Sequence, residues 1–288
     1  MTLQEYLEKK YSPTSIQNYQ SVILRYTTYM QEKAATAGYA DVLEYIGYLR
    51  KLNLHPKSLR NNLFAIKIYY RWLVATGKRK DHPCEKLYLQ DQINRSIAVE
   101  SLYSPQALEE LFKTYKSSNP FYQKRDEVII SLLIYQALMI QEIAQLKISD
   151  INLEEGTVKI KGNVKNKGRL LHLKSNQGLL FYKYINEDRK EILSLNQTGS
   201  NVFILSKKGV AIFPGIINKM INENRKQHEK LLPIKIRQSV IHHFLKANND
   251  VRLVQVFAGH RRAGSTEEYK QSGLEELKAS INKLHPLQ

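Results

Sequence analysis

Cysteine is almost absent from this chain of 288 residues, in which Cys84 is the single example. One thiol excludes an internal disulfide framework and a cysteine-based zinc site, and it suits a reducing compartment. Glycine and proline number only 13 and 8, which excludes a fibrous or low-complexity protein. No histidines lie four residues apart beside a glutamate, as in a helical zinc site. We therefore expect no bound metal and no cofactor.

Long hydrophobic runs are also missing. The longest apolar stretch, residues 128–140, is broken by Ser131 and Gln136, so it is too short and too polar to span a bilayer. The opening residues lack the basic and apolar segments of a secretion signal. From these features we expect a cytoplasmic protein that does not associate with membranes.

Acidic residues are few relative to basic ones. There are 27 Asp and Glu against 44 Lys and Arg, which gives a net charge of +17 and a pI of about 9.7. Residues 45–80 contain nine Lys and Arg and no acid. A solvated helix face would normally alternate both signs, whereas a run of bases binds phosphates and releases their counterions. The chain is therefore predicted to bind a polyanion, and double-stranded DNA is the favoured partner.

Apolar residues recur at helical spacing in the first 80 residues, which predicts a small helical bundle. On the third helix, Arg60, Lys67 and Arg71 fall about a quarter turn from the apolar stripe, so we expect them to contact DNA. The three stripes are Ile16, Tyr19, Ile23, Tyr26 and Met30; Val42, Tyr45, Ile46 and Leu49; and Leu59, Leu63, Ile66, Tyr70 and Leu73.

Polar sequence with weak periodicity follows this bundle. We divide the chain into a helical DNA-binding domain at residues 1–80, a linker at 81–103 and a second domain at 104–288. Lys78, Arg79 and Lys80 form a basic cluster where the linker begins. This cluster suits contact with a DNA backbone, and an ordinary solvated linker is an equally good interpretation.

The second domain is predicted to be mainly helical with a small antiparallel sheet. Ser104 and Pro105 are typical of a helix start. Two alternating segments, at residues 157–161 and 169–173, predict strands joined by a lysine-rich hairpin at 162–168. The predicted helices are 105–116, 122–138, 175–193, 213–228, 234–247 and 250–258.

A motif near the end of the chain carries the clearest signal. Residues 253–260 read Leu-Val-Gln-Val-Phe-Ala-Gly-His, and Tyr269 follows His260 by nine positions. This pattern resembles that of the tyrosine recombinases, the phage integrase and Xer group. The resemblance covers nearly the whole chain. It implies a four-helix SAM-like core-binding bundle followed by a mostly helical catalytic domain, and a site-specific DNA recombinase or integrase, such as that of a mobile element.

The resemblance also assigns catalytic roles. Tyr269 takes the position of the nucleophile, which forms a 3′-phosphotyrosyl link to DNA. Arg237 matches the second phosphate-clamping arginine, and His260 matches the histidine of the Gly-His element. The lysine that protonates the leaving 5′-oxygen is Lys165 or Lys167, because the hairpin is one residue longer than usual. Neither ATP nor a metal is required, because the covalent link conserves the energy of the phosphodiester.

The usual pattern is broken at three positions. Met139 stands where the first arginine is expected, and Ile234 and Gln238 replace two further histidines. A thioether cannot clamp a phosphate, so a cation from elsewhere is needed for full activity. Arg262 is one candidate, and Arg261 and Lys147 are others, because each lies near an active-site element in the sequence.

Two further functions stay open. The three replacements fit a recombinase-like accessory protein that binds DNA without cutting it, and the basic helices fit an RNA-associated protein less well. In relatives the terminal helix docks on a neighbouring protomer to build a tetramer on DNA. Here the tail has helical spacing, so we expect a homotetramer on DNA, with a second recombinase as an alternative partner. The spaced apolar residues are Leu274, Leu277, Ile281 and Leu284.

Overall fold

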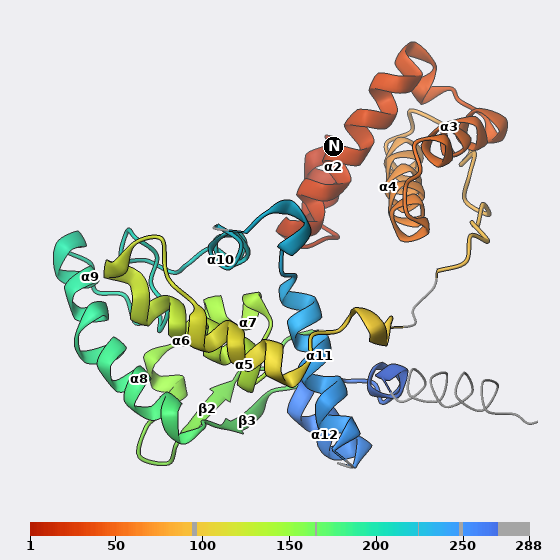
Figure 1. The fold of residues 1–288 in the computed structure, drawn as a ribbon. Helices are drawn as coiled ribbons and strands as arrows, with labels where there is room; N and C mark the ends of the chain where they lie inside the picture. The colour runs from red at the N-terminus through yellow and green to blue at the C-terminus, as the bar shows by residue number, and fades with distance from the viewer. Residues whose placement is uncertain (94–96, 165, 224, 248–249, 270–288) are drawn as a thin grey trace, which may run out of the picture. The chain divides into compact units, whose positions relative to one another are not determined.

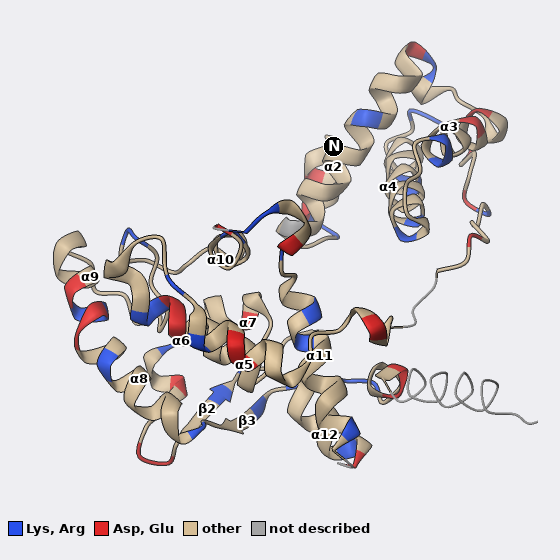
Figure 2. Cartoon of the chain, in the orientation of Figure 1, with Lys and Arg blue, Asp and Glu red and all other residues tan. Residues whose placement is uncertain are grey.

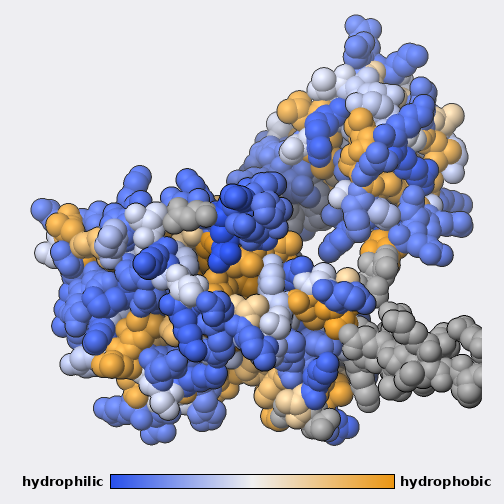
Figure 3. Space-filling model, viewed as in Figure 1, coloured by the Kyte–Doolittle hydropathy of each residue, from blue (hydrophilic) through white to orange (hydrophobic). Residues whose placement is uncertain are grey.

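The computed structural model describes residues 1–93, 97–164, 166–223, 225–247 and 250–269. The chain divides into two compact units, Met1–Asn94 and Arg95–Gln288. The ribbon in Figure 1 shows the helices of both units. Each unit has its own hydrophobic core. Among the described residues, no helix is long and apolar enough to cross a membrane. Hydrophilic side chains cover most of the face in view, with smaller apolar patches between them (Figure 3).

The first unit is a helical bundle whose long helices pack through the predicted stripes. Pro56 occupies the first turn of the longest helix, where its missing N–H costs nothing. The five apolar residues predicted for that helix, from Leu59 to Leu73, are all buried. The helices are α1 (Leu3–Glu8), α2 (Pro13–Met30), α3 (Tyr39–Lys51) and α4 (Pro56–Ala75), with a 3₁₀ turn η1 (Gln31–Ala35).

The second unit is mostly helical and contains one small sheet. Its helices are α5 (Pro105–Thr114), α6 (Gln123–Tyr135), α7 (Ile140–Gln145), α8 (Ser175–Asn186), α9 (Asp188–Asn196), α10 (Pro214–Met220), α11 (Pro233–Lys246) and α12 (Val251–Ala258). Short 3₁₀ turns are η2 (Val99–Ser101), η3 (Pro120–Tyr122), η4 (Ile148–Asp150) and η5 (Gln227–Glu229).

The sheet has three antiparallel strands in the order β1-β2-β3. They are β1 (Ile151–Asn152), β2 (Thr157–Ile160) and β3 (Arg169–His172). Thr157 pairs with His172 and Ile160 pairs with Arg169, so the hairpin spans residues 161–168. The two predicted strands are confirmed. Basic residues lie on both β2 and β3, and others follow α4 in the first unit (Figure 2).

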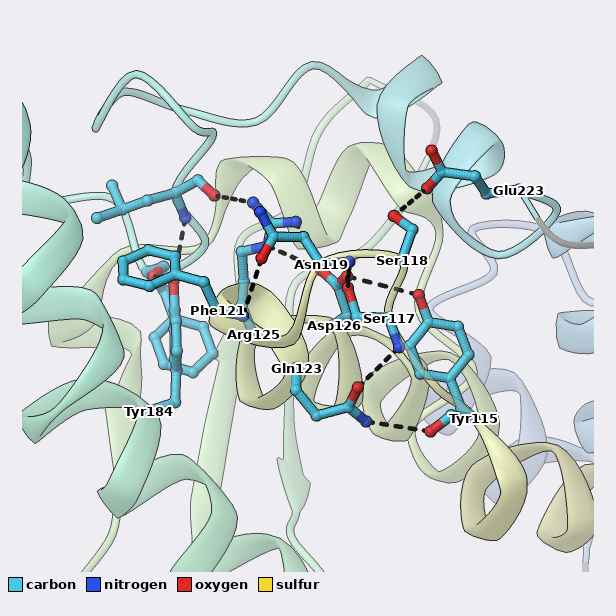
Figure 4. A network of polar contacts seen from close by, with 12 residues as sticks. Tyr115, Ser117, Ser118, Asn119, Phe121, Gln123, Arg125, Asp126, Tyr184 and Glu223 are labelled. Carbon is cyan, nitrogen blue, oxygen red and sulfur yellow. Dashed lines mark hydrogen bonds and ion pairs between the residues drawn. The ribbon is translucent and has the colours of Figure 1, made fainter.

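The core of the second unit surrounds α6, which is buried along nearly its whole length. A polar network fixes the start of this helix (Figure 4). Buried Asp126 accepts a hydrogen bond from the Ser117 hydroxyl at 2.6 Å and pairs with the Arg125 guanidinium at 2.7 Å. Arg125 also donates to the Leu205 carbonyl. Because each buried charge has a partner, the network holds the loop before α6 without an unpaired ion.

Three predicted helices are wrong in extent. Residues 175–193 form two helices, because Glu187 has a non-helical ψ of −89°. The helix predicted at 122–138 ends at Tyr135, and Ala137 has a left-handed φ of +50°. The helix predicted at 213–228 ends at Met220. Shortly after it, the Asn222 side chain hydrogen-bonds the main chain of Leu231 in both directions, which favours a turn over a longer helix.

Candidate active site

Arg237, His260 and Tyr269 lie together in the second unit. Arg237 projects from α11 and is 4% exposed. Its two terminal nitrogens donate hydrogen bonds to the carbonyls of Ala137 and Ala258. Thus α11 brings a buried cation to the loop before α7 and to the end of α12. The three residues that the resemblance to the tyrosine recombinases selects therefore share one region of the fold.

The end of α12 fixes His260. Gly259 adopts a left-handed φ of +70°, which ends the helix in a conformation that other residues rarely adopt. A Cβ atom at Gly259 would lie 2.5 Å from Nη1 of Arg169, so glycine is also required by close packing. The His260 ring nitrogen Nδ1 lies 2.9 Å from the Thr266 hydroxyl, which orients the ring.

Tyr269 stacks on His260, with ring centroids 6.2 Å apart and planes inclined by 21°. Its side chain lies in a small apolar cluster with Ala137, Ile241 and Val254, and the residue is only 7% exposed. The phenol is therefore held beside the histidine and away from solvent.

Burial determines the protonation states of this pair. Desolvation, helped by the charges of Arg237 and Arg169, lowers the pKa of His260 to about 4. Desolvation also raises the pKa of Tyr269 to about 12, although Arg237 opposes the increase. At neutral pH both side chains are therefore uncharged. His260 can therefore form hydrogen bonds but is not a cation, and the phenol of Tyr269 keeps its proton.

Glu142 and Arg169 complete the buried cluster. Arg169 forms a two-pronged ion pair with Glu142, with N–O distances of 2.8 and 3.0 Å. Nη1 of Arg237 approaches the same carboxylate at 3.9 Å. These cations lower the pKa of Glu142 against its desolvation. The sequence analysis singles out neither residue, and no spacing rule predicts that they pair.

The hairpin tip is joined to the segment that carries His260. Asn166 forms an isolated bridge with His260, and the Lys167 amide donates to the Gly259 carbonyl at 2.9 Å. The Arg261 guanidinium donates to the Asn163 carbonyl. Lys167 is exposed, and Lys165 lies outside the described residues. The fold therefore brings the lysine-rich tip next to His260.

Met139 caps the start of α7, where the first arginine was expected. It is partly buried, and its sulfur lies 3.9 Å from the Asn166 side-chain nitrogen. Ile234 is 57% exposed at the start of α11, and Gln238 is partly buried one turn later.

The suggested substitute cations lie at the surface. Arg262 and Lys147 have exposed side chains, and exposed Arg261 is engaged by the hairpin. Within the part of the chain that the structure describes, no three His, Cys, Asp or Glu residues gather as a metal site would require.

Two of the predicted DNA-binding residues on α4 form hydrogen bonds with the segment that follows the bundle. Exposed Arg60 donates to the Asp91 carbonyl at 2.7 Å. Lys67 is only 7% exposed, so the structure does not present it to solvent, and its contact with DNA stays a prediction. Its ammonium donates to the Glu85 carbonyl at 2.9 Å and lies over the Tyr88 ring.

The other predicted DNA-binding residues surround the end of α4. Arg71 is partly buried, and Lys78 and Lys80 are exposed. Arg79 is partly buried, because it donates to two main-chain carbonyls before α3 and pairs with Asp81. The exposed bases can meet a phosphate as they stand. Arg79 would have to exchange partners first.

Comparison with protein families identifies the class. The phage integrase family model matches residues 102–276, and the phage integrase N-terminal SAM-like domain model matches residues 3–77. The chain belongs to the phage integrase family. The predicted family and the mainly helical fold class are confirmed, and so are site-specific DNA recombination as the function and DNA as the partner.

Curated relatives match over nearly their full length. The chain is 24% identical to tyrosine recombinase XerC of Oceanobacillus iheyensis, covering 99% of this chain and 95% of that protein. It is 26% identical to tyrosine recombinase XerD of Staphylococcus haemolyticus, covering 99% and 98%.

Solved structures share the fold. The Tn1549 transposon integrase in complex with circular intermediate DNA has a TM-score of 0.63 at 14% identity, covering 96% of this chain and 99% of that chain. The XerH recombinase bound to palindromic difH substrate has a TM-score of 0.64 at 19% identity, covering 85% and 72%.

Proposed function

We propose that this recombinase cuts DNA with Tyr269. The phenolic oxygen attacks the scissile phosphorus, a 3′-phosphotyrosyl bond forms, and the bond to the 5′-oxygen breaks. The phenol gives its proton to solvent water, and the leaving oxygen gains one from Lys165 or Lys167. A 5′-hydroxyl from another strand then reverses the reaction. The observation that carries this proposal is the meeting of Arg237, His260 and Tyr269 in one buried cluster.

The surroundings of the cluster suit this chemistry. The pentacoordinate phosphorane carries more negative charge than the phosphodiester, so fixed donors stabilise it most. The charge of Arg237 acts on Tyr269. Burial lowers the pKa of Arg237, and an arginine side chain is effectively always protonated in proteins. Neutral His260 can donate a hydrogen bond to a non-bridging oxygen. The bridge between Asn166 of the hairpin and His260 supports a role for a hairpin lysine at the leaving oxygen.

On DNA binding, Tyr269 has to leave its apolar contacts before its phenolic oxygen can attack the scissile phosphorus. Tyr269 is the last residue of a short helical segment at residues 264–269, directly before residues 270–288. A shift of that segment would expose the hydroxyl without disturbing Arg237 on α11. Incubation with a nicked suicide substrate tests the proposal, because a covalent adduct that disappears in Tyr269→Phe requires this oxygen as the nucleophile.

The missing first arginine predicts slow chemistry. Loss of one preorganised oxyanion donor typically costs about 2.7–4 kcal/mol, or roughly 10²–10³ in rate. This penalty weakens cleavage without abolishing it. The proposed enzyme is therefore an active tyrosine recombinase with a depleted phosphate clamp.

A second function is favoured by Met139, Ile234 and Gln238 at positions where the family has catalytic side chains. In that case the protein binds DNA, or a partner recombinase, and does not cut. Binding would be unaffected by Tyr269→Phe, and cleavage would appear only in Met139→Arg. Cleavage by the wild-type protein on the recombination sites of its own genetic element excludes this function.

Assembly on DNA is the remaining proposal. The apolar residues of the tail lie outside the described residues, and we place them on a neighbouring protomer in a homotetramer on DNA or in a complex with a second recombinase. Removing residues 274–288 should abolish the higher-order complexes and leave single-site binding intact. An unchanged assembly would contradict this arrangement. A cytoplasmic location stays a prediction.

A further inference from the structure

One carboxylate faces both buried arginines of the active site. Arg169 holds Glu142 with two short contacts, of 2.8 and 3.0 Å, whereas Arg237 lies 3.9 Å from the same group. The side chains of Arg169 and Glu142 are 1% and 3% exposed. Water therefore cannot screen this carboxylate, and its charge acts on the nearest cation.

The arrangement of Arg169 is rigid. It begins β3, and its guanidinium is packed against Gly259 so closely that a Cβ there would collide with Nη1. Its Nε has no hydrogen-bond partner among the described residues, and Glu142 is its described ion-pair partner. The Arg169 guanidinium therefore interacts mainly with the Glu142 carboxylate. The Met139 amide also donates to Oε2 of that carboxylate, at 2.9 Å.

Removal of Arg169 would change the partner of Glu142. The carboxylate would be buried and unpaired, which is costly, and Arg237 is the nearest remaining cation. A close pair between Glu142 and Arg237 would cancel most of the charge of Arg237. That matters more here than in an enzyme with two clamping arginines, because Met139 supplies no charge.

We propose that Arg169 is a positioning residue that occupies both oxygens of Glu142 and so keeps the charge of Arg237 available to the scissile phosphate. This inference rests on the proposed function. Arg169 touches neither the phosphate nor the nucleophile in this role. It acts through Glu142, and its effect therefore depends on the charge of that residue.

Variants that remove the charge of Arg169, of Glu142 or of both residues test the proposal. The rate of adduct formation on a suicide substrate is measured for the wild type, Arg169→Gln, Glu142→Gln and the double variant. Arg169→Gln should slow cleavage on the order of 100-fold, the effect of losing one oxyanion donor. The double variant should recover most of that loss, because no carboxylate remains to capture Arg237. Arg169→Lys, which keeps the charge, should stay faster than Arg169→Gln.

Arg189→Gln is the matched control. Arg189 is a mostly buried arginine of the same unit that donates to the carbonyls of Ser200 and Val202, far in sequence from the catalytic motifs. Melting temperatures separate lost folding from lost chemistry. A double variant no faster than Arg169→Gln, or a loss in Arg169→Gln equal to that in Arg189→Gln, would overturn the role of Arg169. Absence of a wild-type adduct would instead reject the proposed function.

Discussion

His260 and Tyr269 lie in stacked contact, with ring centroids 6.2 Å apart, although nine positions separate them in the sequence. The turn at Gly259 and the hydrogen bond from His260 to Thr266 bring this about. The spacing that defines the motif thus corresponds to one loop and about one and a half turns of helix. The stack keeps the Tyr269 ring next to the imidazole of His260, and the phenol is largely shielded from water.

The protonation of His260 predicts a pH dependence of stability. The folded histidine has a pKa of about 4, against an ordinary value of 6.5. Between these values the unfolded chain binds a proton that the folded chain does not, so acidification favours unfolding. The stabilising contribution is complete above about pH 6.5 and is lost as the pH falls towards 4.

Thermal melts of the wild type and His260→Gln over this range check the prediction. Both proteins lose stability in acid through other groups, so the difference between them isolates His260. We expect the wild-type melting temperature to fall more steeply than that of the variant from pH 6.5 to 4. Parallel curves would show that His260 titrates normally in the folded protein.

If a hairpin lysine is the general acid, its loss should slow cleavage to a degree that depends on the leaving group of the substrate. If Lys167 protonates the leaving oxygen, Lys167→Ala should lose roughly 10²–10⁴ in cleavage rate, the usual value of general acid catalysis. A substrate with sulfur at the bridging 5′ position needs no such proton, because a thiolate is a good leaving group. The loss should then disappear. Lys165→Ala is assayed in parallel, and the lysine whose defect is rescued by sulfur is the general acid. Rescue of neither would place the acid elsewhere.

The basic residues of α4 should separate into two kinds. Arg71 is partly open to solvent, whereas Lys67 is buried and bonded to the Glu85 carbonyl. If Arg71 contacts one phosphate, Arg71→Gln should reduce the salt dependence of DNA binding, lowering the slope of log K against log salt by about 0.9. Lys67→Gln should mainly lower the melting temperature. Filter binding across a salt series measures the first effect, and equal slopes for both variants would contradict this division.

Much of the fold follows from the sequence because its signals are local. The stripe from Leu59 to Leu73 identifies α4, and Ser104 with Pro105 marks the start of α5. The ends of helices are harder to predict. Glu187 breaks a continuous helical pattern, and nothing in its neighbours distinguishes that break from a helix turn.

The site is predictable only in part for a similar reason. Tyr269 and His260 are visible through their spacing, since a single motif contains both. Glu142 and Arg169 lie 27 residues apart, and they meet because the β2–β3 hairpin folds against α7. The burial of Lys67 likewise depends on a segment that follows the bundle. Contacts between distant segments leave no periodic trace in the sequence.

Trapping the covalent intermediate tests the central claim most directly. Wild-type protein and Tyr269→Phe are incubated with a nicked suicide duplex that carries the recombination site, and adducts are resolved on a denaturing gel with and without protease. The account predicts a protease-sensitive adduct, joined at the 3′-phosphate, that forms with the wild type and is absent from a variant that still binds the site. An adduct of equal yield in Tyr269→Phe, or none with the wild type, would contradict it.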